Sequence, residues 1–133
     1  MENIFENEYS KVTYEEDLKI LNIIWTEKRL TFEEYQRPFT ICLNYMKKKK
    51  VDNYISDIRK QTIISPEFRK WLQDYVLPEA VKAGLKRIVV VANVNVFKQY
   101  YINNVFKSAS KFGIPLKTFN TLEEAKNWFK SFT

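Results

Sequence analysis

The sequence predicts a single α/β domain with a mixed, mainly parallel sheet covered by helices. Strand-like and helix-like segments alternate along most of the 133 residues, a pattern typical of chains that build βαβ units. Residues 87–92 form a continuous, largely β-branched run, which is typical of a central strand covered on both faces. Only two glycines and four prolines occur, and no flexible linker divides the chain. We therefore predict one domain over residues 1–133.

The chain is expected to open with an antiparallel β-hairpin and a helix. Residues 9–14 alternate and are rich in aromatic and β-branched side chains, and residues 18–25 follow as a second strand after a polar turn. Thr31 and Glu34 form a capping box that predicts the start of a helix, whose apolar positions recur at helical spacing. Pro38 lies inside this pattern and should kink the helix, because it removes one backbone hydrogen bond.

The rest of the chain predicts three strands, each followed by a helix. The predicted strands are residues 51–58, 87–92 and 116–119. The residues expected to cap the helices after them are Ser65, Asn95 and Thr121. Pro78 should break or bend the first of these helices, and Tyr100 and Tyr101 cannot both face inward on the second. The predicted order is β-β-α-β-α-β-α-β-α, with a parallel sheet after the hairpin.

The formal net charge of +6 is distributed unevenly along the chain. Residues 1–34 contain nine acidic and four basic residues, whereas residues 35–133 contain seven acidic and eighteen basic residues. A basic surface attracts phosphates and acidic partners. The same pattern is expected if an acidic start simply packs beside a basic body, so charge alone does not identify a partner.

Cysteine usage and hydropathy indicate the compartment. Cys42 is the only cysteine, and a lone thiol cannot form an internal disulfide, which favours a reducing environment. The chain does not start with a basic segment followed by an apolar stretch. The longest apolar run, residues 88–92, is too short to cross a bilayer. We expect a soluble, cytoplasmic protein that is not transmembrane.

No catalytic or metal-binding constellation is visible in the sequence. Histidine, the commonest general base and metal ligand, is absent. Cys42 falls on the apolar stripe of a predicted helix, where it is expected to act as a small buried hydrophobic residue. The chain contains no phosphate-binding glycine loop or dinucleotide fingerprint. We therefore expect a non-enzymatic protein without cofactor or metal.

Five features of the chain carry a resemblance to a known superfamily. They are the hairpin ending in Trp25, the strand end at 54–59, the helix start at 64–67, and the segments 71–78 and 83–88. With the element order, they resemble STAS-like domains, the superfamily of sulfate-transporter and anti-sigma-factor-antagonist domains. Within it the chain looks most like small bacterial STAS/SEC14-like proteins. The resemblance spans residues 4–129 and implies a STAS-like fold.

The resemblance also bears on regulation. Regulatory members of the superfamily are phosphorylated on a serine that opens the helix after the third strand. In this chain Pro66 stands at that position, and Ser65 stands where those proteins tend to carry aspartate. Proline cannot be phosphorylated, and the glycine that usually follows is missing. The resemblance therefore implies the fold without the phosphorylation switch.

Polar residues follow the predicted parallel strands at the points where they end. They are Asp57, Arg59, Ser65, Asn93, Asn95 and Asn120. Ligands of open α/β sheets bind outside the carboxyl ends of the strands, so we predict these six as ligand-binding or partner-binding residues. Arg59 could hold a phosphate or carboxylate, supported by Ser65. Alternatively, Ser65 and Asn95 are ordinary helix caps and Asp57 pairs with Arg59.

Three functions remain open on the sequence alone. The leading hypothesis is a non-enzymatic STAS-like binding or regulatory module, acting on a protein partner or small ligand through the strand-end face. The second is a small lipid or metabolite carrier with an apolar pocket. The third is polyanion binding through Lys47–Lys50, although lysines at a helix C-terminus are also favoured by the helix dipole. The chain contains no nucleic-acid recognition module, so nucleic acid is not the favoured partner.

Overall fold

A six-stranded mixed sheet lies at the centre of the computed structural model, which describes residues 1–93 and 95–133, without the side chains of Val96 and Phe97. Its strands are β1 (Glu2–Glu6), β2 (Ser10–Glu15), β3 (Ile20–Trp25), β4 (Asn53–Asp57), β5 (Arg87–Val91) and β6 (Leu116–Phe119). They lie side by side in chain order, β1 through β6. The pairs β1–β2 and β2–β3 are antiparallel, whereas β3 to β6 are parallel. The expected mixed, mainly parallel sheet is therefore confirmed.

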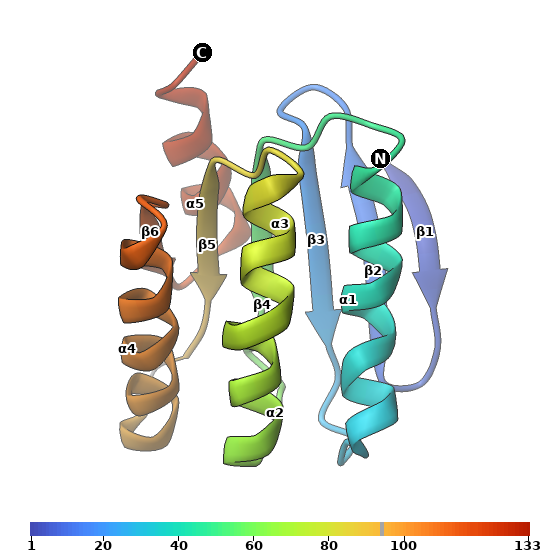
Figure 1. Ribbon diagram of the computed structural model, residues 1–133, viewed down its shortest axis with the longest axis vertical. Coiled ribbons are helices and arrows are strands. Elements are labelled where there is room, and N and C mark those ends of the chain that lie inside the picture. The colour runs from blue at the N-terminus through green and yellow to red at the C-terminus, as the bar shows by residue number, and fades with distance from the viewer. Residues whose placement is uncertain (94) are drawn as a thin grey trace.

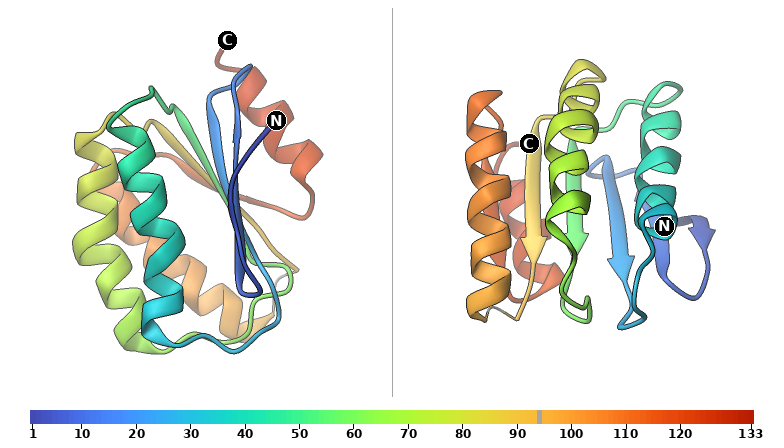
Figure 2. Two further views of the ribbon diagram at one scale, coloured as in Figure 1. Left: turned by 90° about the vertical axis from the view of Figure 1, so that its right-hand side faces the viewer. Right: turned by 60° about the horizontal axis from the view of Figure 1, so that its bottom comes forward.

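Helices cover the two faces of this sheet unequally (Figures 1 and 2). One face carries α1 (Phe32–Met46), the segment α2 (Pro66–Trp71), η1 (Leu72–Val76) and α3 (Leu77–Lys82), and α4 (Val96–Lys111). The other face carries α5 (Leu122–Lys130). Because parallel neighbours follow in chain order and crossovers are right-handed, the three connections between β3 and β6 place their helices on the same face.

Each face has its own hydrophobic core. The core beneath α1, α3 and α4 is the larger one, and Trp25 stacks there on Tyr35 with ring centroids 5.4 Å apart. Both rings are buried, as is the neighbouring Phe39. The smaller core lies beneath α5, where Phe129 packs with Ile55 of the sheet. The central strands are therefore covered on both faces, as the β-branched run predicted.

Strand β1 is the one element that the predicted order lacks. The observed order is β-β-β-α-β-α-β-α-β-α when the α2–η1–α3 segment is counted once. β1 lies at the edge of the sheet and pairs with β2 alone, with a bulge between Asn3 and Phe5. None of its residues is fully buried. An edge strand with so little buried surface leaves a weak hydrophobic pattern, which explains why the hairpin prediction missed it.

The predicted helix boundaries agree with the backbone. The predicted caps Thr31, Ser65, Asn95 and Thr121 each accept a backbone N–H with the side chain. Gly84 and Gly113 follow helices with positive φ values of 103° and 72°, conformations that glycine adopts without steric cost. In the described part of the chain, no helix is both long and apolar enough to cross a membrane.

The two helical prolines act differently from one another. α1 continues without interruption through Pro38. Ahead of Pro78 the helix widens into the π-helical turn η1, in which the Leu77 N–H donates to the Leu72 carbonyl five residues earlier. Proline has no N–H, and its ring clashes with the carbonyl four residues before it in a regular α-helix. The π-turn changes the backbone at this point, so the helix continues through Pro78 instead of ending.

Candidate functional site

All six residues predicted from the strand ends lie at one edge of the sheet. Asp57 is the last residue of β4, and Arg59 follows it closely. Ser65 caps α2, Asn93 and Asn95 lie between β5 and α4, and Asn120 lies between β6 and α5. Because β4, β5 and β6 are parallel, their carboxyl ends share this edge, which lies at the bottom of Figure 1. We call it the strand-end face.

Asp57 and Arg59 form a bidentate ion pair on this face. The Arg59 Nε lies 3.0 Å from Asp57 Oδ1, and its Nη2 lies 2.7 Å from Oδ2. The Asp57 side chain is 4% exposed, and the hydrogen bond to it raises the pKa of the Arg59 guanidinium. A buried carboxylate requires such a partner. The geometry therefore favours the interpretation in which Arg59 neutralises Asp57 and is not free to hold an external anion.

The other predicted residues have local structural roles or project into solvent. Ser65 Oγ accepts the Phe68 N–H at 3.4 Å, and Asn95 Oδ1 accepts the Lys98 N–H at 2.9 Å. Both are N-caps, the alternative interpretation of these residues. Asn93 and Asn120 are exposed. The six residues therefore lie along one edge of the sheet, but their side chains do not converge on one point.

A cavity of about 530 Å³ opens at the strand-end face. It lies between the connection from β4 to α2 and the first turns of α4. Its lining includes Ile58, Gln61, Ile64, Arg69, Lys98 and Tyr101. Of the six predicted residues, Asn95 alone lines it. Small-molecule sites span roughly 300–1,000 Å³, so this cavity is large enough to hold a small organic molecule.

The charged residues that line this cavity are both cations, Arg69 from α2 and Lys98 from α4. The Lys98 ammonium donates to the carbonyl oxygens of Ile58 at 2.8 Å and Arg59 at 3.3 Å. Burial lowers the pKa of Lys98, and the nearby Asp57 carboxylate opposes that effect. Lys98 therefore joins α4 to the connection after β4 and gives the cavity part of its positive charge.

Two buried nitrogen atoms beside this cavity have no hydrogen-bond partner in the described part of the chain. They are Gln61 Nε2 and Arg69 Nε. The Gln61 residue is 8% exposed, and the Arg69 guanidinium lies 5.1 Å from the centre of the Tyr100 ring. Leaving a buried donor unsatisfied costs about 1–3 kcal/mol. Both residues line the cavity, and a small side-chain movement would let a ligand with acceptor oxygens satisfy these donors.

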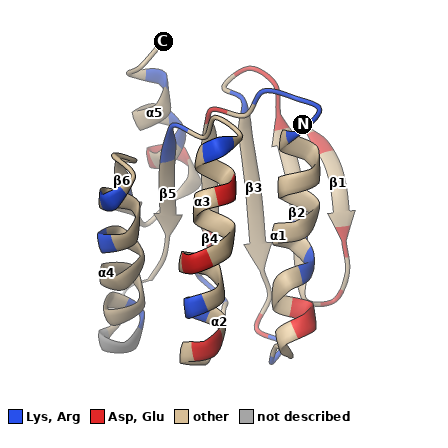
Figure 3. Ribbon diagram, viewed as in Figure 1, with Lys and Arg blue, Asp and Glu red and all other residues tan. Residues whose placement is uncertain are grey.

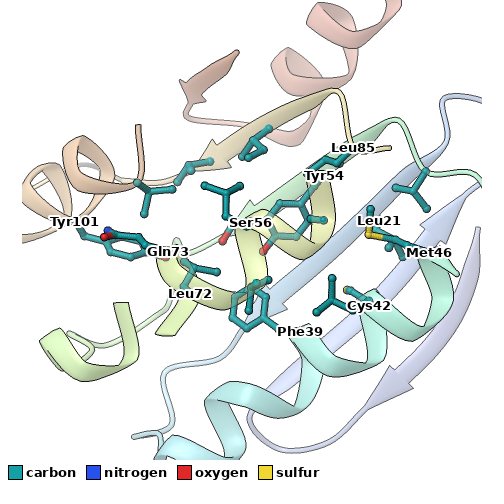
Figure 4. Close-up of a pocket in the computed structure, with 18 residues that line it drawn as sticks. Leu21, Phe39, Cys42, Met46, Tyr54, Ser56, Leu72, Gln73, Leu85 and Tyr101 are labelled. Atoms are coloured by element: carbon teal, nitrogen blue, oxygen red, sulfur yellow. The ribbon is translucent and has the colours of Figure 1, made fainter. Parts of the chain in front are cut away.

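A second cavity lies inside the larger core (Figure 4). Its volume is about 60 Å³, and its lining is almost entirely apolar, including Phe39 and Cys42. The labelled hydroxyls of Tyr54 and Ser56 lie near its centre in Figure 4. Burial raises the pKa of the Cys42 thiol from 9.0 to about 12. Cys42 is therefore a protonated core residue, as the sequence predicts, and lacks the thiolate character that nucleophilic chemistry requires.

The lysine turn, Lys47–Lys50, lies at the end of the sheet opposite the strand-end face (Figure 3). Lys49 pairs with Glu16 at 3.1 Å and lies over the Tyr14 ring, 5.1 Å from its centre. The remaining lysines of the turn are exposed. A row of solvated lysines at a helix C-terminus is stabilising in its own right, so this turn needs no ligand to account for it.

The sequence pattern did not single out Gln61, Arg69 or Lys98. Arg69 and Lys98 fall within the first four residues of their helices. Cations are disfavoured there by the helix dipole, and the first turn of α4 contains no acidic residue to compensate. The cation in the first turn of α4 is a signal that could have indicated this cavity, whereas Arg69 follows the first turn of α2, which contains the acidic Glu67, and gave no such signal. Gln61 lies in an irregular connection and gave no such signal.

Comparison with known proteins does not add a family or a relative. No family model matches the chain, and no curated protein matches it. Within the residues that the structure describes, carboxylate and thiol groups do not gather in threes that could hold a metal ion. The fold and the site together define an α/β protein with a cavity at the carboxyl ends of its parallel strands, whose mainly apolar lining includes two cations.

Proposed function

We propose that this protein is a non-enzymatic, STAS-like binding module that acts through its strand-end face. The resemblance in sequence supports this proposal, as does the mixed sheet with strands in chain order and connecting helices on one face. Pro66 occupies the position at which regulatory STAS-like domains carry their phosphorylated serine. The module would therefore respond to what it binds and not to phosphorylation at that position.

One observation carries the proposal: the 530 Å³ cavity at the strand ends combines two cations with buried, unpartnered donors. Native proteins pair nearly all buried polar groups, so exceptions that face a cavity are typical of binding sites. The cavity also lies at the carboxyl ends of parallel strands, where open α/β sheets bind their ligands. Fold analogy alone would be a weaker argument, since one fold supports many functions.

The carrier hypothesis finds less support in the inner cavity. A cavity of about 150 Å³ that was engineered in another protein binds benzene. The inner cavity here has only about 60 Å³. An acyl chain would therefore have to displace core side chains such as Phe39 or Leu72. Tight packing makes such displacement costly. We therefore place ligand binding at the strand-end cavity.

The experiment is a thermal-shift screen of the full chain against a library of small metabolites. Compounds that raise the melting temperature are retested on Thr62→Trp, because Thr62 is exposed and lines the strand-end cavity. The matched control is Thr40→Trp, at an exposed threonine of α1. We expect stabilisation to persist in Thr40→Trp and to be lost in Thr62→Trp. Compounds that stabilise both variants equally, or a library without any stabilising compound, would contradict the proposal.

A further inference from the structure

We infer that the strand-end cavity takes a small organic anion, with one carboxylate or phosphate group attached to an apolar body. This inference rests on the proposed function and specifies its ligand class. It follows from three properties of the cavity: the sign of its charge, the kind of hydrogen-bonding group left unpaired, and the apolar character of the remaining wall.

The charge argument begins with the two cations. Arg69 and Lys98 reach the cavity from different helices, and the residues that line it include no acidic side chain. The nearest carboxylate described above, Asp57, is already bound in bidentate fashion by Arg59. Two cations that face a partly enclosed space raise the local concentration of anions. An arginine fork also matches the planar geometry of carboxylate and phosphate oxygens.

The unpaired hydrogen-bonding groups also favour an anionic ligand, and this argument does not depend on net charge. The unpartnered buried atoms beside the cavity, Gln61 Nε2 and Arg69 Nε, are both donors. Gln61 is 92% buried, so bulk water does not readily solvate its amide. A donor needs an acceptor, and an oxyanion offers several lone pairs in a small volume. A cationic or purely donor ligand would leave both atoms unsatisfied.

The apolar part of the lining specifies the rest of the ligand. It includes Ile58, Ile64, Tyr100 and Tyr101, together with Ile63, whose side chain is 75% exposed. A bare phosphate ion would leave this surface in contact with water. A ligand with an apolar body would bury it, at about 25 cal/mol per Å² of apolar surface removed from water. The cavity is therefore suited to an organic anion and not to an inorganic one.

Four probes separate charge from apolar contact: benzoate, phenyl phosphate, inorganic phosphate and benzyl alcohol. Binding to the full chain is measured by calorimetry and by NMR shifts of the Gln61 side-chain amide. We expect benzoate or phenyl phosphate to bind at least about tenfold more tightly than inorganic phosphate and benzyl alcohol, and the tighter of the two identifies the oxyanion. Added salt should weaken binding, because the attraction is partly electrostatic.

The variants test the two cations directly. Arg69→Gln and Lys98→Gln should each weaken binding by at least about tenfold, whereas Lys98→Arg should retain most of it. Arg69→Lys keeps the charge but loses the planar fork and the Nε donor, so its affinity should lie between those of the wild type and Arg69→Gln. The matched control is Lys107→Gln, an equal loss of charge at an exposed position of α4, which should change affinity less than about twofold. Melting temperatures of the unliganded variants show whether each variant still folds. If a glutamine variant does not fold, the charge-retaining variants still test the proposal.

The outcomes separate this inference from the proposed function. If benzyl alcohol binds as tightly as benzoate and shifts the Gln61 amide, the site exists but does not select anions, so the inference alone fails. Equal loss of affinity in Lys107→Gln would also overturn it, because binding would then follow net charge and not the cavity. If no probe binds and Thr62→Trp leaves every compound of the library screen unaffected, both proposals fail.

Discussion

The two cavities share a wall but differ in almost every other property. Tyr101 lines both the inner cavity of about 60 Å³ and the strand-end cavity of about 530 Å³. The inner cavity is lined mainly by apolar groups of the sheet and its covering helices, and its described lining includes one unpartnered hydroxyl, that of Tyr54, but no charged residue. The strand-end cavity has cations and unpartnered donors in its wall. The core on one side of Tyr101 is therefore nearly filled by side chains, whereas a large space remains on the other side.

The difference shows which part of the molecule is not optimised for close packing alone. Small apolar voids are ordinary defects of a close-packed core. A larger cavity with buried donors costs stability, since those donors lose hydrogen bonds to water without replacing them. Such a cost is expected at sites where a ligand later provides the missing partners. The comparison predicts that substitutions at the inner cavity change stability, whereas substitutions at the strand-end cavity change binding.

The largest expected effect is on stability at the inner cavity. Phe39 lines it and is 4% exposed, so Phe39→Ala should lower the free energy of unfolding by about 3–5 kcal/mol. The control is Phe106→Ala, at a phenylalanine of α4 that is 49% exposed, where a change within about 0.5 kcal/mol is expected. Urea denaturation measures both values. Equal losses for the two variants would show that the inner core is not packed as described.

Alkaline pH should reduce stability through groups that the larger core keeps protonated. Burial raises the pKa of Cys42 from 9.0 to about 12 and that of Tyr101 from 10.0 to about 12. The unfolded chain therefore binds fewer protons than the folded chain in this range, and stability falls as pH rises from 9 towards 12. Burial lowers the pKa of Lys98, which acts in the opposite direction.

Cys42→Ala isolates one of these groups. Each group contributes at most about 1.4 kcal/mol per pH unit, so the variant should have a shallower fall than the wild type by up to this amount. The measurement is urea denaturation at a series of pH values, and the slope with pH is compared because the substitution also changes the absolute stability. An unchanged slope in Cys42→Ala would show that the thiol ionises as readily in the folded protein as in the unfolded chain.

The last effect distinguishes two arginines near the strand ends. Arg59→Gln leaves the buried Asp57 carboxylate without its bidentate partner and should lower the free energy of unfolding by about 1–3 kcal/mol. Affinity for the anionic probes should fall less than in Arg69→Gln, because Arg59 does not line the cavity. Arg69→Gln is the matched variant and should show the reverse, a large loss of affinity with little loss of stability. If both arginines behave alike, the division between the two roles is wrong.

Most of the fold follows from signals that are local in the sequence. Capping side chains such as Thr31 and Ser65 and the apolar run at 87–92 are each sufficient to place an element. β1 could not be placed in this way, because an edge strand without a fully buried residue has little periodicity to detect. The π-turn before Pro78 could not be predicted from the sequence either, because a proline in a helical pattern is compatible with a break, a bend or a wider turn.

The sequence predicted at which edge of the sheet the candidate site lies, but not which residues line it. Parallel strands bring their carboxyl ends together, so the sequence located the strand-end face. The polar residues at those ends turned out to be occupied, Asp57 by Arg59 and Asn95 by the backbone of α4. The cations that line the cavity, Arg69 and Lys98, come instead from helical positions further along the chain. Which donors remain unpaired depends on side-chain packing between distant segments, and no local pattern encodes that.

The π-helical turn also determines which way the strand-end half of its helix faces. One additional residue in a helix rotates everything before it by about 100° relative to everything after it. Leu77 and Ala80 are anchored in the large core after this turn, and Arg69 precedes it. Shortening the segment 72–76 by one residue would remove the additional residue and rotate the Arg69 guanidinium about the helix axis, away from the strand-end cavity. The orientation of this cation is thus encoded by helix length as much as by residue identity.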